Sequence, residues 1–253
     1  MNRAAVYVLW LREMKRFFRA KSRVVGNLAM PLFFLAFLGL GFNRMVVPGM
    51  PHDVNYIRFL VPGILGMSLL FSSTFGGLSV LWDREFGFLK EIMVAPVNRV
   101  SIVLGRVAGG VTTSMMQGVL ILIASTVLGF RFSSVVSILI SFVFMVLISI
   151  TFLGLGLIFA SMMKDMQGFS IVINFVIFPL FFLSGAIYPL ENFPNWLRVF
   201  SYLDPLTYGI DGLRNTLIGV SSYPLVFNLA IMLVFSFGMV ILGAYFFEKS
   251  ESV

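Results

Sequence analysis

The chain has 253 residues, of which 59% are hydrophobic and only 11% are charged, and its mean hydropathy is +0.99. Soluble domains carry about a quarter charged residues, so this chain has too little charge to solvate a globular surface of its size. Despite a net charge of +7, the low polar content excludes a disordered or nucleic-acid-binding chain. The composition therefore predicts an all-α, polytopic membrane protein.

The cysteine and histidine counts exclude several kinds of catalytic and metal-binding site. The absence of cysteine excludes disulfides, thiolate metal sites and cysteine nucleophiles. The only histidine, His52, lies in a loop between Pro51 and Asp53. We therefore expect no catalytic residues, no metal site and no cofactor bound by this chain.

Residues 1–23 predict an amphipathic helix, over about 4–22, that lies on the inner face of the membrane. Four arginines recur on one stripe of this helix and four apolar residues on another: Arg12, Arg16, Arg19 and Arg23 against Val6, Trp10, Met14 and Phe17. Anchoring to anionic lipid is enough to explain most of this segment.

Long charge-free intervals indicate membrane spans, because charged residues are costly at the bilayer centre. Six intervals reach the roughly 20 residues needed to cross the hydrocarbon. They give spans at about 24–43, 59–82, 107–130, 134–160, 168–190 and 224–247.

Thirteen of the 18 Lys and Arg residues fall on one side and five on the other, which predicts cytoplasmic termini. We expect one domain, residues 1–253, in a prokaryotic cytoplasmic membrane.

The loop after the second span predicts a short amphipathic helix over 82–94. Its apolar stripe consists of Trp82, Phe86, Leu89 and Met93, and Pro96 ends it. An apolar ridge flanked by mixed charge suits a groove in a soluble partner. The alternative is a helix that rests in the lipid interface, and periodicity does not separate the two.

The segment between the fifth and sixth spans, on the outer side, predicts two short helices. One covers about 194–201, with Trp196 and Phe200 on one side. The other begins at Pro205 with Asp204 as N-cap and ends at Gly219. Both are too short to cross the bilayer but long enough to dip into it. Asp211 and Arg214 become helix neighbours that could pair with each other or across a dimer axis.

Two absences bear on the energy source. No lysine follows the glycines of a phosphate-binding loop, so ATP would have to be hydrolysed by a partner chain. All eleven acidic residues fall outside the six spans as drawn, which argues against a proton- or sodium-coupled transporter.

Few polar residues fall inside the spans. The candidates for lining a pathway are Ser68, Ser72, Gln117 and Asn174, and Asn27 is also polar. Such groups more often form hydrogen bonds between helices, so packing is the alternative for each of them. Gly105 and Gly109 form a small-xxx-small pattern that predicts close helix packing.

Two separated stretches carry a family motif. The first is Arg84-Glu85-Phe86-Gly87-Phe88-Leu89-Lys90-Glu91, followed by Pro96 and Gly105; the second is Pro179…Leu183-Ser184-Gly185…Tyr188-Pro189…Pro194…Asp204-Pro205-Leu206-Thr207-Tyr208…Arg214. In both, the chain resembles the permease subunits of type-2 ABC exporters, the family that includes the daunorubicin-resistance and nodulation lipo-oligosaccharide permeases. Lys90 and Arg106 depart from the residues common in that family, Glu and Lys.

The resemblance implies a mechanism. Two six-span subunits would form the pathway, and each would dock a soluble ATPase, which binds the ATP and Mg²⁺, through the cytoplasmic helix after the second span. The implied docking residues are Arg84, Glu85, Phe86, Gly87, Phe88, Leu89, Lys90, Glu91 and Pro96. The implied outer gate is residues 191–219, with Pro194, Trp196, Asp204, Pro205, Tyr208, Ile210, Asp211, Leu213 and Arg214. If helix 205–218 packs against its mate, Ile210 and Leu213 should contact the second subunit.

Several alternatives remain open at this point. A transporter or channel without an ATPase, and a membrane scaffold, are the competing functions. The second subunit is a copy of this chain or a related permease. A drug, a lipid or another amphipathic molecule is the expected cargo, by resemblance alone, and export is favoured over import on the same ground.

Overall fold

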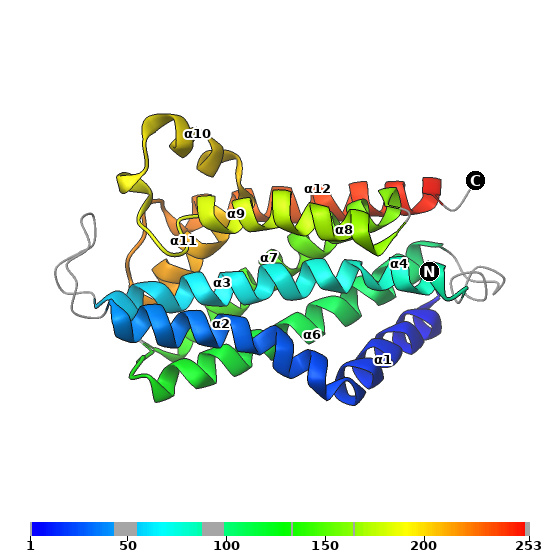
Figure 1. The fold of residues 1–253 in the computed structure, drawn as a ribbon, viewed down its shortest axis with the longest axis horizontal. Helices are drawn as coiled ribbons and strands as arrows, with labels where there is room; N and C mark the ends of the chain where they lie inside the picture. Colours follow the sequence, from blue (N-terminus) through cyan, green and yellow to red (C-terminus); the bar gives the residue numbers. More distant parts are fainter. Residues whose placement is uncertain (1, 43–54, 88–98, 133, 164, 251–253) are drawn as a thin grey trace.

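The computed structural model describes residues 2–42, 55–87, 99–132, 134–163 and 165–250, which form helices and short connections with no strand among them (Figure 1). The α-helices are α1 Arg3–Arg19, α2 Lys21–Gly41, α3 Tyr56–Gly77, α4 Ser79–Glu85, α6 Arg99–Val127, α7 Val135–Met162, α8 Met166–Val172, α9 Phe178–Leu183, α10 Asn195–Leu203, α11 Pro205–Ile218 and α12 Leu225–Ser250. A π-helix, Ile173–Ile177, joins α8 to α9, and a short 3₁₀ helix covers Leu190–Asn192.

Six helical segments of the described chain are long and apolar enough to cross a membrane, which confirms the predicted number. They cover Val24–Gly41, Tyr56–Asp83, Val100–Val127, Val135–Met162, Met166–Leu183 and Leu225–Lys249. Two spans differ from their predicted bounds by seven residues at one end: the third begins at Val100 and not near residue 107, and the fifth ends at Leu183 and not near residue 190. Gly185 adopts a φ of 73°, a left-handed conformation that ends the helix before Pro189.

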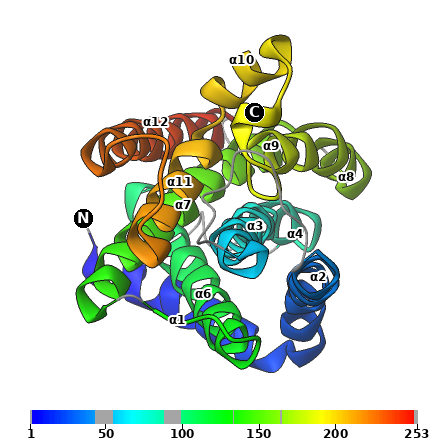
Figure 2. The same cartoon turned by 90° about the vertical axis from the view of Figure 1, so that its left-hand side faces the viewer.

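α3 and α7 lie at the centre of the bundle, and the other spans surround them (Figure 2). α3 is buried along nearly its whole length. Glycines bring the central helices together: a Cβ atom on Gly77 of α3 would overlap the backbone of Gly156 of α7. On the other side of α7, a Cβ on Gly154 would lie 2.7 Å from the Met239 carbonyl oxygen of α12. These close approaches let the helix backbones pack tightly, and buried hydrogen bonds between Ser236 of α12 and Thr151 and Leu147 of α7 add to them.

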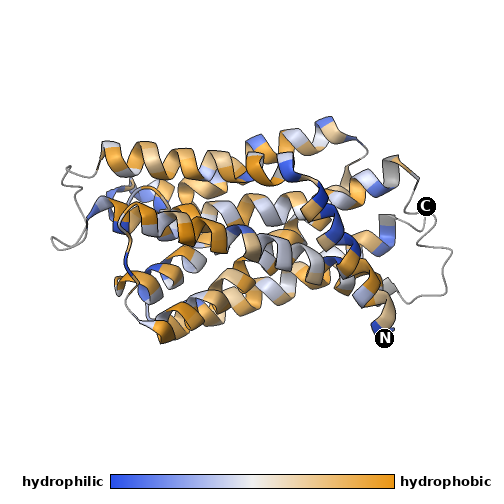
Figure 3. Ribbon diagram, turned by 90° about the horizontal axis from the view of Figure 1, so that it is seen from below, coloured by the Kyte–Doolittle hydropathy of each residue, from blue (hydrophilic) through white to orange (hydrophobic). Residues whose placement is uncertain are grey.

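α1 lies at an angle to the spans, along α6, and meets α2 at an elbow at Ala20 (Figure 1). The spans are mostly hydrophobic along their length, whereas α1 carries a run of hydrophilic residues (Figure 3). Gly105 and Gly109 of α6 face α1. A Cβ on Gly105 would lie 2.8 Å from the Cβ of Leu9, and a Cβ on Gly109 would lie 2.7 Å from the Cβ of Glu13. The packing role predicted for this glycine pair is therefore confirmed.

The two outer helices have the predicted positions but different environments. α10 exposes its apolar side chains, with Trp196 67% exposed. α11 lies inside the bundle, packed against α3, α7 and α12, and most of its residues are buried. Asp204 caps α11 and Gly219 ends it with a φ of 74°, as the sequence predicts.

Candidate functional site

The chain around the expected docking helix does not form one helix over 82–94. α4 ends at Glu85, and Gly87 adopts a φ of 73° two residues later. Glycine at a left-handed position is a usual helix end, so the sequence interpretation was wrong to run the helix through it. Phe86 is 83% exposed at this end of the molecule. The remaining predicted docking residues, Phe88, Leu89, Lys90, Glu91 and Pro96, lie outside the described residues.

Immediately before this segment, Asp83 holds two arginines from distant parts of the chain. Arg12 of α1 donates two hydrogen bonds to it, from Nη1 to Oδ2 at 3.0 Å and from Nη2 to Oδ1 at 2.7 Å. The Nη2 of Arg106, on α6, lies 2.9 Å from Asp83 Oδ2. We call Arg12, Asp83 and Arg106 the charged cluster. It joins three elements at the end of the second span.

The charged cluster is largely removed from water. Asp83 is 4% exposed and Arg106 is 5% exposed, whereas the side chain of Arg12 keeps 29% of its surface. The hydrogen bonds that Arg12 donates to Asp83 raise the pKa of Arg12 above its usual value. A buried carboxylate between two guanidiniums is retained only with good geometry, because each ion loses its hydration. Asp83 and Arg106 also lie within candidate spans, so the expectation that every acid falls outside the spans is wrong at this position.

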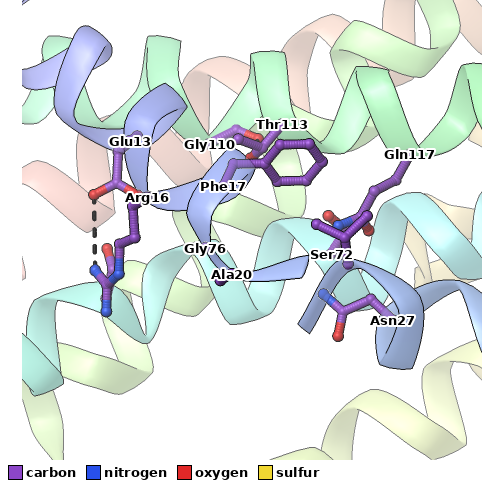
Figure 4. Close-up of a pocket in the computed structure, with 12 residues that line it drawn as sticks. Glu13, Arg16, Phe17, Ala20, Asn27, Ser72, Gly76, Gly110, Thr113 and Gln117 are labelled. Carbon is purple, nitrogen blue, oxygen red and sulfur yellow. Dashed lines mark hydrogen bonds and ion pairs between the residues drawn. The ribbon is translucent and has the colours of Figure 1, made fainter. Parts of the chain in front are cut away.

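A polar pocket lies at the elbow between α1 and α2, against α3 and α6 (Figure 4). We call it the elbow pocket. Glu13 and Arg16 line one end of it, and Asn27, Ser72 and Gln117 lie together at the other. Its volume is about 50 Å³. The predicted pathway residues Ser72 and Gln117 are thus brought together from α3 and α6, with Asn27 of α2 beside them.

Ser72, which lines the elbow pocket, belongs to a row of hydrogen-bonded serines that joins α3 to α6. Ser73 donates to Ser114 at 3.0 Å, and Ser114 donates to Ser72 at 3.0 Å. Gln117 is only 3% exposed, and its Oε1 has no hydrogen-bond partner among the described residues. The serine contacts agree with the packing alternative, but the Gln117 carbonyl is not accounted for by packing.

An apolar cavity of about 170 Å³ adjoins the elbow pocket, and Asn27 and Ser72 line both. We call it the apolar cavity. It lies between α2, α3 and the fifth span, and its other lining residues include Gly26, Met30, Pro31, Met67, Phe71 and Phe178. Phe71 and Phe178 lie with their ring centroids 4.9 Å apart. On this side of the bundle, a pocket with polar side chains is therefore continuous with an apolar cavity.

The other two pathway candidates lie elsewhere. Ser68 is buried in α3 one turn from Ser72, but it lines neither the elbow pocket nor the apolar cavity. Asn174 is exposed in the π-helix and donates to the Ser170 carbonyl within its own segment, at 2.9 Å. The spacing of polar residues in the spans does not distinguish these four positions, because each lies in an apolar helix of similar composition.

Asp211 and Arg214 of α11 each bind backbone, not one another. Asp211 accepts from the amides of Ser222 and Tyr223 at 2.8 and 3.1 Å and from the side-chain amide of Asn228 at 2.7 Å. Arg214 donates to the carbonyls of Gly185 and Ala186 at 2.6 and 3.0 Å. Arg214 thus ties α11 to the loop after the fifth span, and Asp211 ties it to the loop before α12 and to α12 itself. Of the two expected pairings, the one between Asp211 and Arg214 in the same subunit is therefore wrong.

Arg214 also lies over the ring of Phe59, 3.7 Å from its centroid. Burial lowers the pKa of Arg214 to about 10, which leaves the guanidinium protonated at neutral pH. The buried charge is stabilised by the two carbonyl oxygens, which lie just beyond the end of α9, and by the aromatic face.

The expected contact of α11 with a second subunit conflicts with its burial. Ile210 and Leu213 are fully buried in the protomer, and Ile210 packs on Gly66 of α3, where a Cβ would lie 2.6 Å from its side chain. The apolar stripe of α11 therefore faces its own bundle. Among the predicted gate residues, Pro194 and Trp196 are exposed, whereas Asp204, Pro205 and Tyr208 are buried with α11.

The sequence interpretation missed the charged cluster. An acid at the end of one span and an arginine at the start of the next were the available signal, but the third partner, Arg12, is 71 residues from Asp83. Among the described residues, no group of three or more His, Cys, Asp or Glu side chains could hold a metal ion.

Comparison with known proteins places this architecture among transporters. Residues 4–218 match the family described as ABC-2 type transporter. The chain is 30% identical over 234 residues, 91% of this chain and 90% of the relative, to an inner membrane transport permease, YadH, of Escherichia coli K12. It is 31% identical over 197 residues to a putative transport permease, ycf38, of Porphyra purpurea, covering 78% and 68% of the two chains. It is 30% identical over 202 residues to nodulation protein J of Rhizobium meliloti, covering 79% and 76%.

Proposed function

This chain is a multi-pass membrane permease that belongs to the ABC-2 type transporter family, and from that premise we propose that it is the membrane-spanning subunit of an ATP-driven exporter. Two permease subunits form the pathway, and a separate soluble ATPase binds and hydrolyses ATP with Mg²⁺. The cargo is a drug, a lipid or another amphipathic molecule.

The charged cluster is the observation that carries the proposal. It lies at the end of the second span, directly before the segment 84–91 that would dock the ATPase, and it ties this point to α1 and α6. Displacement of the docking segment by an ATPase would therefore pass to the third span through the buried Asp83–Arg106 pair, which resists separation, and less strongly to α1 through the partly exposed Arg12. The lack of a phosphate-binding loop in the sequence supports a separate ATPase.

The outer helices complete the proposal. We assign the gate role to the segment 191–219 as a whole, with the exposed apolar face of α10 as the part available to a second subunit. α11, fixed by Arg214 to the end of the fifth span, would move with that span.

Phe86→Asp tests the docking assignment. Phe86 is 83% exposed, so the variant should fold, but recovery of the ATPase with the tagged permease should fall at least about tenfold, because aromatic anchors at interfaces contribute on the order of 2 kcal/mol. Trp196→Asp is the matched control, since Trp196 is an exposed aromatic residue at the other end of the molecule. Equal ATPase recovery with both variants would contradict the docking assignment. Cargo movement by the purified chain without ATP would instead favour a self-contained transporter.

A further inference from the structure

The elbow pocket contains hydrogen-bonding groups that the protein leaves unused. Gln117 is 3% exposed, and its Oε1 accepts no hydrogen bond from the described residues. At the other end, Nη1 of Arg16 is buried without a hydrogen-bond partner there, and the nearest carboxylate oxygen, on Glu13, is 3.9 Å away. A buried polar group without a partner is unfavourable by about 1–3 kcal/mol, so these atoms indicate a ligand that supplies the missing partners.

The chemistry of these groups restricts the head of such a ligand. The Gln117 carbonyl needs a hydrogen donor and Arg16 needs an acceptor, and the Glu13 carboxylate beside Arg16 can only accept. A phosphate or sulfate only accepts and would also face Glu13. A quaternary ammonium neither donates nor accepts. A hydroxyl or an amide does both without a net charge. At about 50 Å³, the pocket admits only a small head of a few heavy atoms.

The neighbouring apolar cavity restricts the rest of the ligand. It meets the elbow pocket at Asn27 and Ser72, and beyond them it is lined by methionine and phenylalanine side chains of α2, α3 and the fifth span. Its volume of about 170 Å³ exceeds the roughly 150 Å³ of an apolar protein cavity known to hold benzene. A hydrocarbon segment fits this cavity, and its attachment to the head falls between Asn27 and Ser72.

We propose that the elbow pocket and the apolar cavity together bind one amphiphile with a small, uncharged head of hydroxyl or amide groups. The head bonds to Gln117 and the Arg16–Glu13 pair, and the chain lies against Met67, Phe71 and Phe178. The site lies within one protomer, so binding requires neither the ATPase nor a second subunit. Its failure is therefore distinguishable from failure of the exporter proposal.

The experiment measures binding of three probes with the same saturated chain to the purified full-length permease. The probes are a monoacylglycerol, the corresponding alkyl phosphate and the corresponding alkyl trimethylammonium, each with a photoreactive group in the chain. Native mass spectrometry gives the affinities, and crosslinked peptides give the position. We expect the monoacylglycerol to bind most tightly and to label peptides containing Met67 or Phe178.

Two variants test the two halves of the site. Gln117→Leu removes the unpartnered carbonyl, so the monoacylglycerol should bind roughly five- to tenfold more weakly while the unliganded protein unfolds at an equal or higher temperature. Gly26→Leu places a side chain at the cavity, since a Cβ there meets no atom within 4 Å, and should abolish labelling. Gly238→Leu is the matched control, because this helical glycine of α12 is equally open and lies outside both cavities.

Tighter binding of the alkyl phosphate would overturn the assignment of an uncharged head. Equal labelling of Gly26→Leu and Gly238→Leu would overturn the site itself, as would unchanged affinity in Gln117→Leu, since water alone would then satisfy the pocket. Once binding is shown, ATP hydrolysis by the assembled complex identifies the source of the ligand. Stimulation by the monoacylglycerol makes it cargo, and binding without stimulation makes it a resident lipid of the same chemistry.

Discussion

Replacing Asp83 by Asn tests whether the charged cluster holds α1, the end of the second span and α6 together. The side chains of Asp83 and Arg106 are only 5% and 4% exposed, so the variant leaves a buried guanidinium without its counter-ion. Removing one partner of a buried ion pair typically costs about 3–5 kcal/mol. Arg12, with 29% of its side chain exposed, can turn to water and adds little to this cost.

The same reasoning predicts a partial rescue. In the Asp83→Asn background, Arg106→Met removes the stranded charge and fills its place with an apolar side chain of similar length. The double variant should therefore recover at least about 1–2 kcal/mol relative to Asp83→Asn alone, which a double-mutant cycle measures as coupling between the two sites. Arg19→Gln is the control, since this arginine of α1 is exposed and should contribute less than about 1 kcal/mol.

Unfolding in mixed detergent micelles, followed by tryptophan fluorescence, gives the free energies for this cycle. Trp82 is a suitable reporter because Arg16 lies 4.8 Å from its ring centre, next to the charged cluster. If Asp83→Asn lowers the free energy of unfolding by less than about 1 kcal/mol, or if the double variant loses the full sum of the two single losses, the cluster does not hold these elements together.

Three further predictions concern packing and charge elsewhere. Gly109→Leu should weaken the packing of α1 on α6, because the new Cβ would lie 2.7 Å from the Cβ of Glu13, and a water-soluble quencher should then reach Trp10. Gly41→Leu is the control and should leave Trp10 protected, because a Cβ at this end of α2 meets no atom within 4 Å. Arg214→Lys should lower the free energy of unfolding by about 1–3 kcal/mol despite the kept charge, because lysine cannot reproduce both carbonyl bonds and the stacking on Phe59; Arg198→Lys, on α10, should change it less. Burial raises the pKa of Asp204 well above its usual value, so the folded state holds a proton that the unfolded state releases, and stability should fall as pH rises above about 4. Asp204→Asn keeps the N-cap, and its stability should no longer fall over this pH range. Parallel pH–stability curves for the two proteins would show that Asp204 does not cause the fall.

The sequence was sufficient to predict elements whose signals are local. The six charge-free intervals, the Asp204 cap with Pro205 behind it and the glycine end of α11 each depend on residues within a few turns. The Gly105–Gly109 pattern also predicted close packing correctly, although it did not indicate α1 as the partner.

The remaining features depend on which segments meet. Amphipathic periodicity in α11 predicted an apolar face but not that α3 and α7 cover it, so Ile210 and Leu213 were assigned to a subunit contact. The charged cluster joins residues 12, 83 and 106, and no spacing rule links positions so far apart. The helix predicted over 82–94 failed for a different reason, because the apolar stripe outweighed the helix-ending preference of Gly87.

The π-helix in the fifth span constrains the length of this part of the chain. Its five residues, Ile173–Ile177, make one wider turn, so removing a single residue there would restore a regular α-helix. A π-helical residue turns the chain by roughly 80° and an α-helical residue by about 100°, so five residues of the wider turn rotate the chain about as far as four α-helical residues. The wider turn therefore accommodates one extra residue without rotating the helix that follows it. Phe178 and Phe181, whose ring centroids lie 4.9 and 6.4 Å from that of Phe71, keep their place against α3 for this reason. A deletion in the regular α-helix on either side of the π-helix would instead rotate the two segments of this span by about 100° relative to each other.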